Sequence, residues 1–320
     1  MTRKILILLA GILFCVVTAS AQTAAEQFIS PDDTYLFVKR DTCDLYMDIY
    51  HPAKGSQAML NGKEKPTVIF MFGGGFIGGR RDDDSYNKWF RQLTTNGYRV
   101  VSIDYRLGLK GSNKVGIAQV NVLDKAIHMA VEDLFSATNF IIENAASLKI
   151  NPDNMVISGS SAGAISVMQA EYEIANKTTW ASVLPEGFNY AGVMSFAGAI
   201  LSREGKVDYK TAPCPTLMLH GTADELVPYK QIAVLNLGFF GGGKLVERFE
   251  KFGFNYNMYH FKGYGHEIAS SMSTTFDLQL RFLETNVING KNRVLESWVS
   301  DPDVYKGSGP QSRKELYGNK

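Results

Sequence analysis

The chain has 320 residues, of which 45% are hydrophobic, and its 33 basic and 32 acidic side chains give a formal net charge of +1. A chain of this length and composition is sufficient for one large globular domain with an extensive core. The balanced charge excludes a general electrostatic attraction to nucleic acids or to anionic membranes, so we expect a small-molecule substrate.

The first 21 residues have the pattern of a cleaved signal peptide. Two basic residues precede an apolar run over residues 5–17, and small residues follow up to Ala21. The run is shorter than the roughly 20 residues that span a bilayer, which argues against a retained membrane anchor. We therefore expect cleavage between Ala21 and Gln22, a secreted or periplasmic location, and one mature domain over residues 22–320.

The next segments predict the fold class. Residues 34–39 and 44–50 alternate apolar and polar side chains, which is typical of an antiparallel hairpin. Short apolar runs then alternate with segments of helical periodicity, as expected for strands buried on both faces of a parallel sheet. The expected strands are 67–72, 98–103, 155–158, 191–196, 215–220 and 257–261, and the expected helices are 85–95, 125–146, 162–174, 229–237, 244–251 and 274–287.

This alternation predicts an α/β fold, with a doubly wound, mostly parallel sheet of about eight strands and helices on both faces. The mature chain keeps two cysteines, Cys43 in the hairpin turn and Cys214 before a later strand. Several strand spacings of about 4.8 Å would separate them, which exceeds the ~7 Å limit between the Cα atoms of a disulfide. We expect two free, partly buried thiols.

The most informative motif is the G-x-S-x-G pentapeptide at residues 159–163, between an apolar run and a helical segment. Such a pentapeptide forms a sharp strand-to-helix turn that exposes the hydroxyl of its central serine. Ser161 is therefore a candidate nucleophile. The amide of Ala162 would lie at a helix N-terminus, where unpaired N–H groups stabilise a developing oxyanion.

Three other loops follow predicted strands, at the edge of the sheet where ligands bind in this architecture. The glycine-rich residues 73–75 can turn the amides of Gly74 and Gly75 toward a ligand. Asp224 follows a later strand and can accept a hydrogen bond from an imidazole, although the adjacent Glu225 is an alternative acid. His266 follows the last predicted strand on a glycine-flanked loop.

Two further histidines are weaker candidates for the base. His260 lies inside a predicted strand and His220 ends one, so we expect structural roles for both. Ser161, Asp224 and His266 occur in the order that an α/β-hydrolase sheet requires, each after a different strand.

With these residues in place, the chain resembles secreted serine carboxylesterases of the α/β-hydrolase superfamily and is similar to hormone-sensitive-lipase-like and related carboxylesterases. The matching segments are residues 73–76 with 78–79, 103–106, 159–163, 220–224 with 227–228, and 265–267. The resemblance implies an α/β-hydrolase fold, catalysis by Ser161, His266 and Asp224, and an oxyanion hole made by Gly74, Gly75 and Ala162.

Two features depart from the family pattern. The oxyanion motif of the family usually begins with histidine, and Phe72 occupies that position here. The segment before Asp224 is too short for a large lid, which disfavours an interfacially activated lipase. We expect Asp104 and Arg106 to brace the glycine loop through its backbone.

Two segments have open interpretations. Residues 80–84 either line a substrate entrance or form a solvated turn, and residues 239–243 are either a mobile aromatic flap or a connection between two helices.

The predicted activity is hydrolysis of carboxylic esters with short acyl chains through an acyl-enzyme, without a metal or organic cofactor. Acylated carbohydrate is an attractive substrate for an exported enzyme with an open site. Acyl transfer to an alcohol and peptide cleavage are alternatives on the same fold. A non-enzymatic binding protein is a third alternative, but such proteins typically lack a member of the triad.

Overall fold

A computed structural model describes residues 28–111, 120–300, 312 and 315. The predicted signal peptide, residues 1–21, lies outside these ranges, so export stays a prediction. Within the part of the chain that is described, no helix has both the length and the apolar character needed to cross a membrane.

The core of the protein is one twisted sheet with the strand order β1-β2-β6-β5-β7-β8-β10-β13-β14. The hairpin of β1 and β2 is antiparallel, β2 pairs antiparallel with β6, and all the following pairs are parallel. The strands are β1 (Asp33–Lys39), β2 (Asp44–Tyr50), β5 (Thr67–Met71), β6 (Arg99–Ile103), β7 (Met155–Ser160), β8 (Gly192–Phe196), β10 (Thr216–Gly221), β13 (Tyr256–Phe261) and β14 (Leu295–Val299). The fold class is as predicted, and β14 adds one strand to the expected eight.

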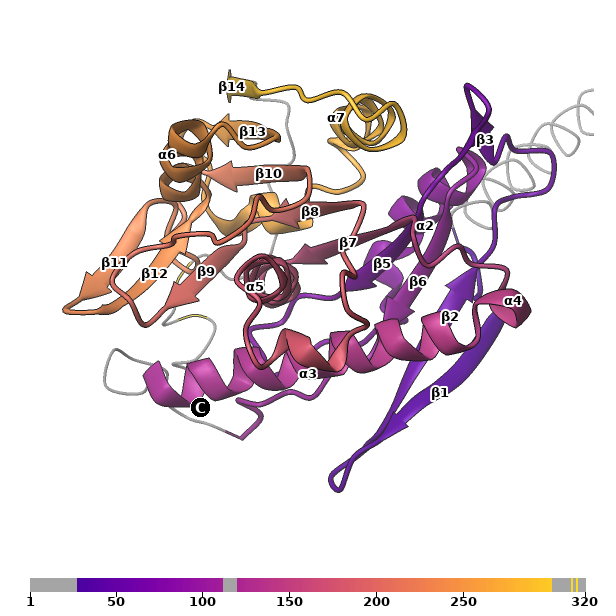
Figure 1. Cartoon of the computed structure of the whole chain (residues 1–320), viewed down its shortest axis with the longest axis horizontal. Helices are drawn as coiled ribbons and strands as arrows, with labels where there is room; N and C mark the ends of the chain where they lie inside the picture. The colour runs from indigo at the N-terminus through magenta and orange to yellow at the C-terminus, as the bar shows by residue number, and fades with distance from the viewer. Residues whose placement is uncertain (1–27, 112–119, 301–311, 313–314, 316–320) are drawn as a thin grey trace, which may run out of the picture.

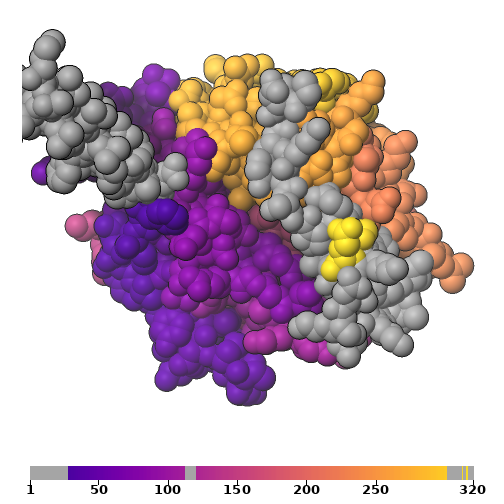
Figure 2. All heavy atoms as spheres, turned by 180° about the vertical axis from the view of Figure 1, so that it is seen from behind, coloured from indigo at the N-terminus to yellow at the C-terminus, as the bar shows by residue number. Residues whose placement is uncertain are grey.

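Helices cover both faces of the sheet, with α3, α5 and α6 on one side and α2 and α7 on the other (Figure 1). They are η1 (Asp84–Tyr86), α2 (Asn87–Thr95), α3 (Val120–Glu143), α4 (Ala145–Leu148), α5 (Ala162–Ala175), η3 (Ala181–Val183), α6 (Gly242–Phe252), η4 (His266–Ser270), α7 (Phe276–Phe282) and the π-helical η5 (Leu283–Ile288). Seen from behind, the N-terminal half and the C-terminal half lie side by side across the surface (Figure 2).

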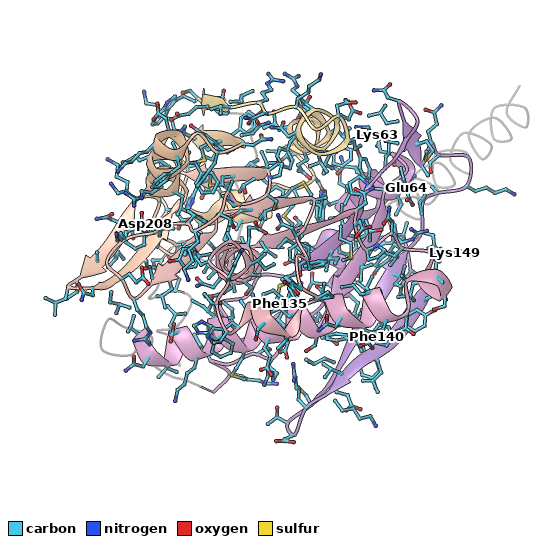
Figure 3. The ribbon with its side chains drawn as sticks, in the orientation of Figure 1. Lys63, Glu64, Phe135, Phe140, Lys149 and Asp208 are labelled. Atoms are coloured by element: carbon cyan, nitrogen blue, oxygen red, sulfur yellow. The ribbon has the colours of Figure 1, made fainter. Side chains whose placement is uncertain are left out.

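The strands at the centre of the sheet are buried along their whole length, which explains their continuous apolar sequences. Helix α3 packs along this core with an apolar face. Its Phe135 is buried, whereas Phe140 contacts Tyr35 of β1 with the ring centroids 6.1 Å apart (Figure 3). Burying one such side chain stabilises the fold by about 1.5–3 kcal/mol.

The predicted helix over residues 229–237 is wrong. This segment contains β11 (Gln231–Val234), which forms a small antiparallel sheet with β12 (Leu237–Gly241) and β9 (Ala199–Ser202). Phe240 of β12 is buried and pairs with Ile200 of β9, and these contacts across the sheet outweigh the local helical spacing. Residues 239–243 end β12 and begin α6, so the expected connection between two helices is wrong.

The strands β3 (Met59–Leu60) and β4 (Lys63–Glu64) form a short antiparallel hairpin, which contains the labelled Lys63 and Glu64 (Figure 3). Cys43 and Cys214 are both free, as expected. Cys214 is buried, but Cys43 is exposed rather than partly buried because it lies in the turn between β1 and β2.

Candidate active site

Ser161 lies in the sharp turn between β7 and α5, with φ 51° and ψ −114°. This conformation is costly for a residue with a side chain, on the order of 1–3 kcal/mol, so the surroundings must impose it. The flanking glycines make the turn possible. A Cβ atom on Gly159 would lie 2.2 Å from the carbonyl carbon of Gly163, and one on Gly163 would lie 2.1 Å from the carbonyl oxygen of Met71.

A chain of hydrogen bonds connects the three residues singled out by the sequence. The Oγ atom of Ser161 is 2.7 Å from Nε2 of His266, and Nδ1 of the same ring is 2.7 Å from Oδ2 of Asp224. The loops after β7, β10 and β13 supply one residue each. All three are buried, with 9% of Ser161, 8% of His266 and 7% of Asp224 exposed.

Asp224 is held as a carboxylate. Its Oδ1 atom accepts hydrogen bonds of 2.9 Å from the amides of Leu226 and Val227. Burial favours the protonated form, but hydrogen bonds from His220 and His266 outweigh it and hold the pKa of Asp224 well below its usual range. The carboxylate therefore carries its charge at neutral pH and fixes the orientation of the imidazole.

The alternative candidates lie elsewhere or have other partners. Glu225 is exposed. His260 is hydrogen-bonded through Nδ1 to the hydroxyl of Tyr229 at 2.6 Å and through Nε2 to Glu296 at 2.7 Å.

The glycine loop lies directly against Ser161. A Cβ atom on Gly73 would be 3.4 Å from the Cβ atom of Ser161. Gly74 and Gly75 have φ values of 128° and 62°, a region that favours glycine. Both residues border the same cavity as Ser161, whereas Ala162 is buried at the start of α5.

Aromatic residues brace this loop in place of the missing histidine. Phe72 is buried and stacks on Tyr105 with the ring centroids 4.4 Å apart. The hydroxyl of Tyr105 donates a 2.7 Å hydrogen bond to the carbonyl of Phe72, and the hydroxyl of Tyr86 accepts one of 3.1 Å from the amide of Gly73. The loop is thus held from both sides by tyrosine hydroxyls.

The expectation that Asp104 and Arg106 bond to the loop backbone is wrong. Asp104 accepts hydrogen bonds from the amide of Tyr46 and from Arg81, and the side chain of Arg106 pairs with acidic residues of α3. The residue between them, Tyr105, contacts the loop instead. Side chains alternate along an extended backbone, so neighbours point in opposite directions.

A cavity of about 270 Å³ opens beside Ser161 and His266. Many of the side chains around it carry a polar group, and several of these come from segments that carry no recognisable motif. The residues other than the glycines, Ser161 and His266 are Arg80, Asp83, Ser85, Tyr86, Ser160, Leu226, Glu267, Ala269 and Ser270. Residues 80–84 thus contribute Arg80 and Asp83 to the cavity, while Arg81 points away and pairs with Asp48 and Asp104.

The family model BD-FAE matches residues 47–179, which include the glycine loop and the serine turn. Gut esterase 1 of Caenorhabditis briggsae is 33% identical over 107 residues, covering 33% of this chain and 18% of that protein. Bile salt-activated lipase of Rattus norvegicus is 27% identical over 196 residues, covering 59% of this chain and 29% of that protein.

Among solved structures, an esterase from Thermogutta terrifontis superposes with a TM-score of 0.56 at 22% identity, covering 78% of this chain and 91% of that one. The fold is therefore that of known esterases, and the matched segments are similar to those of carboxylesterases. The matched segments span less than a third of the length of these two curated relatives.

Proposed function

We propose that the protein is an exported serine esterase that hydrolyses carboxylic esters through an acyl-enzyme intermediate. The observation that carries the proposal is the continuous hydrogen-bond chain from Ser161 through His266 to Asp224 at the edge of a cavity. A hydroxyl, an imidazole and a buried carboxylate in this arrangement are the groups that acyl transfer by a serine requires.

In the proposed mechanism, Ser161 attacks the ester carbonyl carbon while His266 accepts its proton. Asp224 holds the tautomer of the ring and stabilises the imidazolium that forms. The amides of Gly74, Gly75 and Ala162 donate hydrogen bonds to the oxyanion, and each such donor contributes roughly 3 kcal/mol.

The tetrahedral intermediate then collapses, and the proton on the imidazole passes to the departing alcohol. Water attacks the acyl-enzyme in a second round, with the same base, and releases the acid. No metal or organic cofactor takes part in this mechanism.

The cavity supports a small, polar ester as the substrate. Its volume of about 270 Å³ suits a short acyl chain, and most of its side chains bear hydroxyl or charged groups. A polyhydroxylated alcohol could replace the water that solvates these groups. We therefore favour acylated carbohydrates with short acyl chains.

The test is the substitution Ser161→Ala. We expect the variant to fold normally and to lose hydrolysis of p-nitrophenyl acetate by several orders of magnitude, because the nucleophile is gone. Ser147→Ala, which changes an exposed serine of α4, is the matched control and should retain full activity.

A fluorophosphonate probe and mass spectrometry test the same proposal without reference to the substrate. The probe should modify Ser161. Unmodified protein would support a non-enzymatic binding protein, and near-native turnover in Ser161→Ala would overturn the proposed mechanism. Product analysis with a competing alcohol distinguishes hydrolysis from acyl transfer.

A further inference from the structure

Asp224 faces a second imidazole besides His266. Nε2 of His220, the penultimate residue of β10, lies 3.4 Å from Oδ2 of Asp224, the same oxygen that Nδ1 of His266 approaches to 2.7 Å. Only 1% of His220 is exposed. Two buried rings therefore converge on one carboxylate oxygen, and the mechanism above uses only one of them.

The hydrogen bonds of His220 determine which ring nitrogen carries the proton. The amide of Gly242, at the start of α6, donates to Nδ1 at 3.2 Å, so Nδ1 is an acceptor. The proton is then on Nε2, which lies 3.1 Å from the carbonyl oxygen of Val227 and faces Asp224. The helix N-terminus thus orients His220 as a donor toward the carboxylate.

We propose that His220 is a positioning residue that holds Asp224 and moderates its interaction with His266. The proposal rests on the function proposed above. The Nε2–H group shares the charge on Oδ2, so the carboxylate attracts the imidazolium of His266 less strongly than it would alone. The same N–H group also lies near the carbonyl oxygen of Val227. His220 thus connects Asp224 to the loop whose amides, those of Leu226 and Val227, donate to Oδ1 of Asp224.

The balance of contributions to the charge state of Asp224 agrees with this assignment. Burial acts to raise the pKa of Asp224, and the hydrogen bond from His220 ranks with that from His266 among the interactions that lower it. Other titratable groups lie near Asp224, His220 and His266. Arg80, Asp83, Tyr86 and Glu267 line the cavity beside His266, and Glu225 adjoins Asp224. The ring of Tyr229 is 5.7 Å from that of His220, and Tyr229 bonds to His260, which pairs with Glu296.

The test compares His220→Leu with His220→Gln, which keeps an N–H donor. We expect His220→Leu to move the acid limb of the pH profile of kcat/KM for p-nitrophenyl acetate to higher pH by roughly half a unit. A proton then binds more strongly to His266, which must be neutral to act as a base. We also expect kcat to fall about fivefold with little change in KM, because His220 does not border the cavity. His220→Gln should restore both values to near those of the wild type.

His260→Leu is the matched control, because His260 is also buried and lies opposite His220 in the register of β10 and β13, but hydrogen-bonds to Tyr229 and Glu296. It should leave the acid limb in place. The role of His220 would be overturned if the acid limb of the kcat/KM profile stayed at the wild-type pH in both His220→Leu and His220→Gln. A shift of the acid limb in His260→Leu as large as that in His220→Leu would also overturn it.

The pH dependence of fluorophosphonate inactivation gives the same information where turnover is slow. If His220→Leu does not fold, His220→Ala removes the same donor without adding bulk, and a positioning role requires its acid limb to move while that of His220→Gln matches the wild type. Failure of the proposed function has a different signature, which is loss of Ser161 labelling in the wild type at every pH.

Discussion

Single side chains determine whether the glycine loop is rigid. The hydroxyl of Tyr86 accepts the amide proton of Gly73, and its ring packs edge-on against Phe70 with the centroids 4.7 Å apart. This packing leaves the hydroxyl little freedom to move. The amide of Gly73, in the loop that faces Ser161, therefore depends on one tyrosine oxygen from η1.

Tyr86→Phe tests this dependence. The variant keeps the ring but leaves the amide of Gly73 without that acceptor, which costs about 1–3 kcal/mol where water cannot replace it. We expect kcat to fall about tenfold, because the neighbouring oxyanion donors lose their fixed position. Steady-state kinetics and thermal unfolding measure the two effects.

Tyr98→Phe provides the matched control for Tyr86→Phe. The hydroxyl of Tyr98 is buried and has no hydrogen-bond partner among the described residues. Its removal should therefore lower neither kcat nor the unfolding temperature. Equal losses in the two variants would contradict a specific role for Tyr86.

The contrast between predictable and unpredictable site residues has a physical cause. Ser161, Asp224 and His266 were predictable because each follows a buried strand in a short segment rich in small residues. Tyr86 and His220 contribute through contacts between distant segments. The partner of Tyr86 is 13 residues away, and the Gly242 amide that orients His220 is 22 residues away. No local pattern encodes such contacts.

At the level of helices and strands, a buried carboxylate joins the N-terminal hairpin to α3. The side chain of Asp133 is fully buried and accepts hydrogen bonds from Arg40, which follows β1, and from Arg106, which follows β6. Two arginines therefore share one carboxylate that is shielded from water, in addition to their contacts with the more exposed Glu132. Burial raises the pKa of Asp133 in spite of the two arginines.

Asp133→Asn should destabilise the fold by about 3–5 kcal/mol, because it leaves two guanidinium groups without their buried counter-charge. Urea unfolding at neutral pH measures the loss. Glu132→Gln is the matched control, because Glu132 pairs with the same arginines but its side chain is 42% exposed. This substitution should lower the free energy of unfolding by at most about 1 kcal/mol. Similar losses in both variants would contradict the importance of burial.

Elements at the periphery were harder to predict than the central strands. The five residues of β14 alternate in exposure and follow a segment without clear periodicity, so a strand of this length was missed. Tyr229, Ile232, Ala233 and Leu237 are spaced three or four residues apart, as on one face of a helix. Residues 231–234 nevertheless form β11, because they pair with β12. Continuous apolar runs, in contrast, indicate both the strand and its burial.

For the molecule as a whole, the parallel sheet brings the site together. The loops after β5, β7, β10 and β13 all leave the same edge, so Ser161 and His266, which are 105 positions apart in the chain, meet at hydrogen-bonding distance. This arrangement requires the whole sheet to be folded, and activity should therefore depend on global stability.

Global stability includes a titrating group in the core. Glu171 of α5 is buried, accepts a 2.8 Å hydrogen bond from the amide of Cys214, and has its pKa raised by burial to about 7 from an ordinary value of 4.5. The folded state therefore binds a proton more strongly than the unfolded state. The resulting stability is fully present below pH ~4.5 and is lost as the pH rises through about 7.

Glu171→Gln should remove this loss, so its free energy of unfolding relative to the wild type should rise by about 3 kcal/mol between pH 4.5 and pH 8. Glu173 on the same helix provides a contrast of opposite sign. Burial acts to raise the pKa of Glu173, but hydrogen bonds from His128 and Thr178 outweigh it and lower the pKa. The stability that Glu173 contributes is therefore present above the pKa of the unfolded state and is lost as the pH falls below it. The contribution of Glu173 changes below pH 4.5, outside this range. Urea unfolding between pH 4.5 and pH 8 measures the rise for Glu171→Gln, and an unchanged difference from the wild type would contradict the assignment of Glu171.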